Sequence, residues 1–116
     1  MGPAGTVHCT LADAAAYGVL HARGAHGEAG LLVTPAGFAA LHRDWYDQGY
    51  ALGWVPVERE WAGGRALTHT GSNTFWFHDL WVAPARDAVL VTATNAGYGF
   101  PGCDAAVAAL VDRYLP

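Results

Sequence analysis

Lysine is absent from the 116 residues, and serine occurs once, as Ser72. The six positively charged side chains are all arginines, and they are scattered along a chain whose net charge is −4. Non-specific binding of nucleic acid needs clustered cations that displace phosphate counterions, so this class of function is disfavoured. Cysteine is almost as rare. Cys9 and Cys103 could pair, but two cysteines alone identify neither a disulfide nor an oxidising compartment.

Long hydrophobic runs are also missing. No apolar stretch approaches the roughly 20 residues that a membrane-spanning helix needs, so we expect no membrane span. The N-terminus has no basic region followed by an apolar one, so no signal peptide is recognised. These absences fit a cytoplasmic chain as it stands, but they do not fix its compartment.

The residues that are present are those of an ordinary folded domain. Hydrophobic residues make up 53% of the chain and charged residues 14%, which disfavours disorder. A length of 116 residues predicts one domain, residues 1–116, able to bury roughly two-thirds of its unfolded surface.

Three helices are predicted from capping residues and helical spacing. The first covers residues 10–22, with Thr10 as N-cap, Asp13 closing a capping box and Gly24 as the stop. The second begins at Thr34, has proline at its first position, and lines one side with Phe38, Leu41 and Trp45. The third covers about 103–115 and repeats apolar residues at helical spacing: Val107, Leu110, Val111 and Tyr114.

Strands are predicted between the second and third helices. Residues 49–58 have extended character, and a turn at 62–65 leads into a short strand at 65–70. Strands at about 74–83 and 88–95 follow, and their short connection predicts an antiparallel hairpin. The order of helix, helix, three or four antiparallel strands and helix predicts an α+β fold with a helix on one sheet face.

The 65–70 strand ends in His69-Thr70-Gly71, followed by Ser72 and Asn73. A His-Thr-Gly at the end of a strand resembles the third motif of the serine β-lactamase and penicillin-recognising hydrolase families. Four other segments are similar to the C-terminal part of class C β-lactamase-like serine hydrolases, in the family's order and with suitable gaps. They are residues 3–13 (with Cys9 where serine is usual), 31–35, 50–54 and 81–95.

The resemblance covers nearly the whole chain and implies the C-terminal portion of the β-lactamase/transpeptidase-like fold, an antiparallel sheet with flanking helices. In the family, the motifs Ser-x-x-Lys and Tyr-x-Asn come from a mostly helical region that faces this sheet. Neither motif occurs here. The resemblance therefore implies a partial domain without the nucleophile, which we do not expect to be active alone.

The same resemblance implies roles for four residues of the third-motif strand. His69 stands where lysine is usual and would face a substrate carboxylate or the family's tyrosine. Thr70 belongs to the same motif, Gly71 would let the substrate backbone approach, and the backbone N–H of Ser72 would be one oxyanion-hole donor. Histidine at this position points to peptidase, amidase or esterase chemistry on a small-molecule or peptide acyl substrate. No cofactor is implied.

Other readings of the polar residues remain. Ser72 could be a nucleophile with His69 or His78 as base and Asp79 as orienter, although alternation along a strand places Ser72 and His69 on opposite faces. Asn73 could simply occupy a turn. The six histidines include no His-Glu-x-x-His, and no Cys-x-x-Cys occurs, so no metal site is predicted.

A second class of function is a non-catalytic binding or sheet-completing interaction module. Such a module would accept an extended segment on an exposed strand edge, from a complementing chain or from a second copy in a homo-oligomer. The five tryptophans fit core packing, or a surface that another polypeptide covers.

Overall fold

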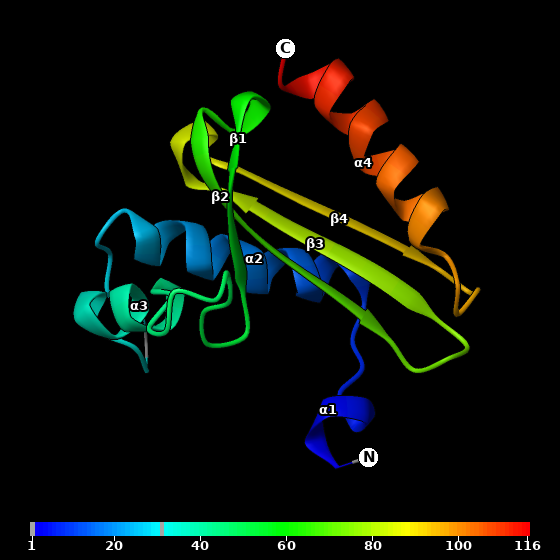
Figure 1. The fold of residues 1–116 in the computed structure, drawn as a ribbon, viewed down its shortest axis with the longest axis horizontal. Helices are drawn as coiled ribbons and strands as arrows, with labels where there is room; N and C mark the ends of the chain where they lie inside the picture. Colours follow the sequence, from blue (N-terminus) through cyan, green and yellow to red (C-terminus); the bar gives the residue numbers. More distant parts are fainter. Residues whose placement is uncertain (1, 31) are drawn as a thin grey trace.

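The computed structural model describes residues 2–30 and 32–116, with the side chains of these residues except Pro3 and Ala4. The fold is α+β with a four-stranded antiparallel sheet in the order β1-β2-β3-β4, as the sequence predicts (Figure 1). Leu31, which opens the 31–35 segment, lies outside the described residues. The elements are α1 (Pro3–Thr6), α2 (Leu11–Ala25), α3 (Pro35–His42), β1 (Val55–Arg59), η1 (Glu60–Ala62), β2 (Gly64–Ser72), β3 (Phe77–Ala83), η2 (Pro84–Arg86), β4 (Ala88–Thr94) and α4 (Phe100–Tyr114).

Helix α2 begins where the sequence predicts but ends later. Thr10 Oγ1 accepts the backbone N–H of Asp13 at 3.1 Å, and the Asp13 carboxylate accepts the backbone N–H of Thr10 at 3.2 Å. The predicted capping box is therefore confirmed. The predicted stop at Gly24 is wrong, because the helix continues to Ala25. A Cβ at Gly24 would overlap the Phe38 ring, so this glycine lets α2 and α3 approach closely.

Gly24→Ala is expected to lower the free energy of unfolding by about 1–3 kcal/mol, because the added methyl group must displace a ring that is 1% exposed. Gly102→Ala in α4 is the matched control, since nothing lies within 4 Å of its added Cβ. The control should be neutral or stabilising by up to about 1 kcal/mol. Urea unfolding measures both variants, and equal unfolding free energies would contradict the packing role of Gly24.

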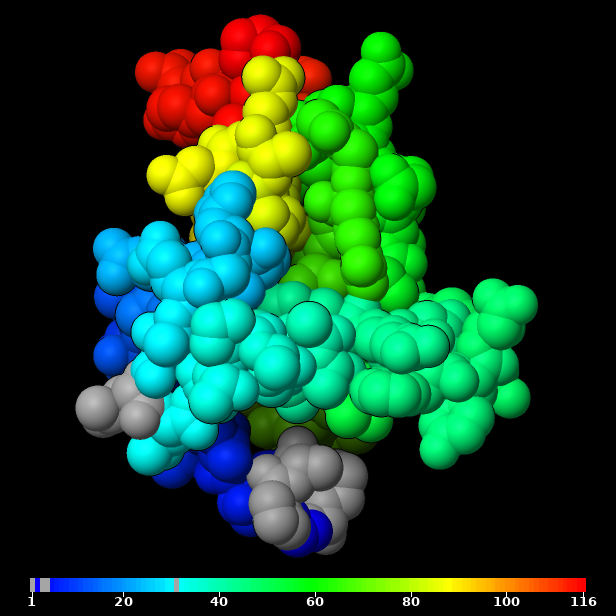
Figure 2. Space-filling model, turned by 90° about the vertical axis from the view of Figure 1, so that its left-hand side faces the viewer, coloured from blue at the N-terminus to red at the C-terminus, as the bar shows by residue number. Residues whose placement is uncertain are grey.

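Helix α3 confirms its predicted start but is shorter than its sequence pattern suggests. Thr34 Oγ1 accepts a backbone N–H from the first turn at 3.1 Å. The helix ends at His42, so Trp45 does not lie on it as predicted. The Asp44 carboxylate instead accepts backbone N–H groups from the residues that follow and closes a loop over 44–49. In Figure 2 this blue-green segment projects from the body of the molecule.

The strands keep their predicted order with shifted ends. The hairpin of β3 and β4 is confirmed. Strand β2 runs over Gly64–Ser72 rather than 65–70, and extended structure in 49–58 takes the form of a strand only from Val55. Strand β3 begins at Phe77 rather than at 74. Asn73 Oδ1 accepts the backbone N–H groups of Phe75 and Trp76, at 3.1 and 2.9 Å, and this holds residues 73–76 in a turn before the strand. The alternative reading of Asn73 as a turn residue is thus confirmed.

Helices cover both faces of the sheet, so the prediction of a helix on one face is wrong. On the face covered by α2, the core consists of apolar side chains from α2, from strands β2 and β3, and from the segment before β1. They are Ala22, Ala51, Trp54, Leu67, Leu80 and Val82. On the opposite face, α4 lies against β3 and β4, where the Phe77 and Phe100 rings meet edge to face and Thr92 Oγ1 donates to the Cys103 carbonyl. The molecule therefore has three layers, with the sheet in the middle (Figure 1).

Candidate functional site

The predicted site residues His69–Ser72 form the C-terminal half of β2, which is paired on one side only. Strand β3 pairs with Leu67–Ser72, whereas β1 pairs only with Gly64–Thr68. Within the described part of the chain, no strand therefore lies against the outer edge of residues 69–72. Backbone N–H and C=O groups along such an edge are available to another extended segment.

The chain before β1 turns away from this edge, and Trp54 in the turn is buried. The Trp54 side chain is 2% exposed and lies in the core beneath α2. The turn that brings it there is closed by a hydrogen bond of 2.8 Å from the Ala51 N–H to the Trp54 carbonyl. Gly53 sits in this turn at φ 89°, a conformation that glycine adopts without a Cβ clash. The pairing of β1 with β2 thus ends at Thr68, where the chain turns through residues 51–54 and Trp54 enters the core.

The four site residues divide between the two sheet faces. The register places His69 opposite Leu80 and Gly71 opposite His78, on the face that α2 covers elsewhere. Thr70 and Ser72 belong to the other face. The backbone edge is therefore the feature that all four share, whereas their side chains do not converge on one point.

His78 joins His69 on the α2 face beside Gly71. A Cβ added to Gly71 would lie 3.4 Å from His78 Nδ1, so the imidazole lies over this glycine. Burial lowers the pKa of His78, the Asp79 carboxylate opposes this effect, and His69 adds to it. The neutral form of His78 is therefore favoured, and a neutral imidazole has one ring nitrogen that can accept a hydrogen bond.

The Ser72 hydroxyl is occupied by local structure. Its Oγ donates to the Gly97 carbonyl and accepts the Thr74 N–H, each at 3.1 Å. A Cβ at Gly97 would overlap the Thr74 carbonyl, so the two loops at this end of the sheet pack closely. Ser72 lies on the face opposite His69 and His78, and the geometry does not support the alternative in which either histidine activates it.

Asp79 does not serve as an orienting carboxylate for a histidine. It is 1% exposed and lies on the face opposite the two histidines of the site. Its carboxylate accepts hydrogen bonds from Thr68 Oγ1 at 3.3 Å and from Trp81 Nε1 at 2.9 Å. Asp79 thus ties β2 to β3 just before the open edge, which is a supporting role.

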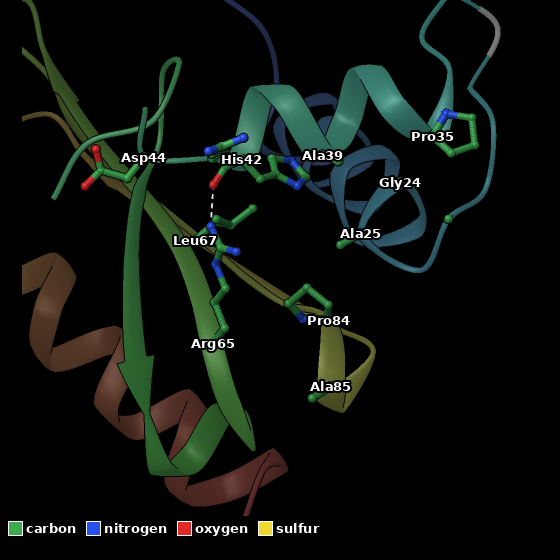
Figure 3. A pocket seen from close by; sticks show the side chains of 12 residues that line it. Gly24, Ala25, Pro35, Ala39, His42, Asp44, Arg65, Leu67, Pro84 and Ala85 are labelled. Carbon is green, nitrogen blue, oxygen red and sulfur yellow. Dashed lines mark hydrogen bonds between the residues drawn. The ribbon is translucent and has the colours of Figure 1, made fainter. Parts of the chain in front are cut away.

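A separate hollow of about 550 Å³ lies between α3, the end of α2, β2 and η2 (Figure 3). His42 and Arg65 line it, and the Arg65 guanidinium donates to the His42 carbonyl oxygen across it. None of the four predicted site residues lines this hollow. Arg65 thus connects α3 to the sheet, a contact that no sequence pattern predicts.

A buried histidine pair that the sequence does not predict lies next to this hollow. His21 Nδ1 and His42 Nε2 are 2.8 Å apart, and the two side chains are 3% and 6% exposed. Burial lowers the pKa of His21. Burial, together with the charges of His21 and Arg65, lowers the pKa of His42 to about 4. His21 and His42 lie 21 residues apart in the chain, and no local pattern in the sequence connects them.

Three further properties bear on function. No three His, Cys, Asp or Glu side chains of the described residues gather closely enough to hold a metal ion. Cys9 is exposed and Cys103 is buried, and both are free thiols. No helix in residues 2–30 and 32–116 is long and apolar enough to cross a membrane.

The resemblance to β-lactamase-related hydrolases is a prediction from sequence motifs alone. Comparison with known proteins found no match among protein-family models, curated proteins or solved structures.

Proposed function

We propose that this chain supplies the substrate-facing wall of an acyl-transfer cleft, as part of a serine hydrolase related to the β-lactamases and penicillin-recognising enzymes. The observation that carries the proposal is the open outer edge of His69–Ser72, in a strand that is paired on both sides only at Leu67 and Thr68. An ester, amide or peptide substrate would lie along this edge as an added strand.

The residues of this edge would make different contacts with such a substrate. Main-chain groups of 69–72 would hydrogen-bond its backbone, and the Ser72 N–H would be one donor to the oxyanion that forms on the attacked carbonyl. His69 would hydrogen-bond a substrate carboxylate or a neighbouring tyrosine. Because the chain has no lysine and no Ser-x-x-Lys or Tyr-x-Asn, the nucleophile and its base would come from another polypeptide segment.

The chain alone is therefore expected to resist covalent serine probes. We would incubate it with a fluorophosphonate and with a fluorescent penicillin and measure the intact mass. No adduct is expected, because the Ser72 hydroxyl bonds Gly97 and Thr74 and lacks a base. Ser72→Ala is the control and should behave like the parent chain. A stoichiometric adduct on Ser72 that this variant lacks would contradict the proposal.

The oxyanion role can be tested once a complementing segment with Ser-x-x-Lys and Tyr-x-Asn is found, in frame upstream of the first codon or in a neighbouring gene. In the reconstituted complex, Ser72→Ala keeps the backbone N–H and should leave kcat/KM within about threefold. Ser72→Pro removes this N–H and should lower kcat by about 10²–10³-fold. Circular dichroism checks that both variants fold. An equal effect of the two substitutions would contradict an N–H donor at residue 72.

A second candidate function is reversible binding of an extended segment without acyl transfer. The same open edge at His69–Ser72 favours this function, because main-chain hydrogen bonds can hold an extended segment whether it belongs to a substrate or to a binding partner. The two functions predict different results once the complementing segment is present. A hydrolase forms a covalent adduct with the probes above, whereas a binding module does not.

A further inference from the structure

Helix α3 is held against the rest of the molecule by contacts that include the buried histidine pair. The Phe38 ring of α3 lies against Gly24 of α2. His42, the last residue of α3, has its Nε2 atom 2.8 Å from His21 Nδ1 of α2. The Arg65 guanidinium of β2 donates to the His42 carbonyl oxygen (Figure 3). A helix of eight residues is not stable by itself in water, so α3 depends on these contacts.

An added proton is costly in the folded surroundings of this pair. The rings of Tyr17, Phe38 and Trp54 lie around His21 at centroid distances of 4.6, 5.6 and 4.7 Å. A first added proton would place a charge among these rings, where it is poorly solvated. A second would leave two N–H groups facing each other across 2.8 Å and would break the hydrogen bond of the pair.

The charged groups around the pair do not compensate such a charge. Asp44 is the one acidic side chain among the described residues that line the adjoining hollow, and its carboxylate accepts backbone N–H groups of the loop that follows it. Arg43 and Arg65 line the same hollow and are themselves positive. The segment 51–54, which brings Trp54 to the pair, contains no charged residue. Protonation is therefore relieved by exposing the rings to water.

We propose that acid opens this protein locally: when the histidine pair takes up protons, α3 and the loop over residues 43–50 leave α2, while the sheet stays folded. In Figure 2 this cyan to blue-green part of the chain lies on the surface that faces the viewer. The hollow beside His42 separates part of α3 from β2 and η2, so the helix has open space next to it. The Leu52 N–H, which donates to the Leu41 carbonyl at 3.2 Å, is released in the same step. This conformational response is independent of the proposed acyl-transfer function.

The direction of the response follows from the two forms. Burial, followed by the charges of His21 and Arg65, lowers the pKa of His42 in the closed form from 6.5 to about 4, and burial also lowers the pKa of His21. In the open form both rings are hydrated and bind protons near pH 6.5. The closed form is thus fully favoured above pH 6.5 and loses ground as the pH falls toward 4. Burial raises the pKa of Tyr17, so this phenol stays neutral throughout.

Hydrogen exchange of the full chain at pH 7 and at pH 5 tests the opening. Protection factors remove the pH dependence of the chemical exchange itself and report the opening. The protection factors of the α3 amides and of the Leu52 amide are expected to fall about twentyfold between these two pH values. Low concentrations of urea should hardly change them, because opening α3 exposes little surface. The protection of the β3 amides should fall steeply with urea, since these amides exchange by unfolding of the whole sheet.

Variants of α3 and its contacts separate the titration from simple packing. The double variant His21→Asn with His42→Gln removes the titration, so its α3 protection factors should differ by less than about twofold between pH 7 and pH 5. His8→Gln replaces an exposed histidine and should keep the full response. Phe38→Leu weakens a contact of α3 that does not titrate, so it should lower the protection of α3 equally at both pH values.

Three outcomes would overturn the inference. The first is a set of α3 protection factors that does not change with pH. The second is an equal urea dependence for α3 and β3, which would mean that α3 opens only when the whole chain unfolds. The third is a full pH response in the double variant. The first two are measured on the unmodified chain, so they decide the matter even if the double variant does not fold. An adduct on Ser72 overturns the acyl-transfer proposal alone, so the two failures can be told apart.

Discussion

The free energy of unfolding is expected to fall by about 3 kcal/mol between pH 7 and pH 4 because of the buried pair His21 and His42. Their ring nitrogens are 2.8 Å apart, so one ring donates and the other accepts, and the pair cannot carry two protons on the shared bond. The rings of Trp54, Phe38 and Tyr17 lie around His21 at centroid distances of 4.7, 5.6 and 4.6 Å. A charge placed there would be poorly solvated.

The sign of the effect follows from the direction of the pKa shift. Burial, followed by the charges of His21 and Arg65, lowers the pKa of His42 from 6.5 to about 4, so the unfolded chain binds a proton at a higher pH than the folded protein does. The stabilisation is thus fully present above pH 6.5, is lost as the pH falls, and levels off near pH 4. A pKa change of this size in one group corresponds to about 3 kcal/mol of unfolding free energy. Burial also lowers the pKa values of His21 and His78, which adds to the effect in the same direction.

Urea unfolding at a series of pH values between 7 and 4 measures this loss. The double variant His21→Asn with His42→Gln keeps hydrogen-bonding groups but removes the titration, so its pH dependence should be much flatter, although its stability at pH 7 is lower. His8→Gln replaces an exposed histidine and should keep the parent slope. If the double variant retains the full pH dependence, the buried pair is not its source.

The helices and the hairpin could be predicted because their signals are local. Thr10 and Thr34 cap their helices through hydrogen bonds to residues three positions later, and this spacing is visible in the sequence. The end of α2 could not be predicted in the same way. Gly24 signals a helix stop, but here its missing Cβ accommodates Phe38, which lies in another helix. The contact with Phe38, and not the local sequence, therefore determines the role of Gly24.

The candidate site shows the same division between local and tertiary signals. Alternation along a strand already indicated that Ser72 and His69 face opposite ways, and the register confirms it. The openness of the edge at residues 69–72 could not be predicted, since it depends on where β1 stops. The grouping of His78 with His69, and the separation of Asp79 from both, depend on the register of β2 with β3. The roles assigned to His69, Thr70, Gly71 and Ser72 stay predictions.

Trp54→Ala is expected to produce the largest loss of stability, about 3–5 kcal/mol. The indole is 2% exposed, lies in the main core cluster, stacks on Tyr17 at 6.0 Å and contacts the buried histidine pair. Removing it leaves a cavity beneath α2 and opens the pair to water. Trp76→Ala is the matched control, because Trp76 is 58% exposed in the turn before β3 and should change the unfolding free energy by less than about 0.5 kcal/mol.

Trp54 also connects the core with the proposed site, so its loss should change the open edge. Residues 51–54 turn away from β2 as Trp54 enters the core, and no strand of the described residues lies on the outer side of 69–72; we infer that the burial of Trp54 sets this turn. Trp54→Phe keeps a large apolar ring and should lose only about 1–2 kcal/mol while preserving this turn. Hydrogen exchange of the variants that remain folded should show altered protection at residues 69–72 in Trp54→Ala but not in Trp54→Phe. Equal protection in the two would mean that the edge is open for a reason other than the burial of this side chain.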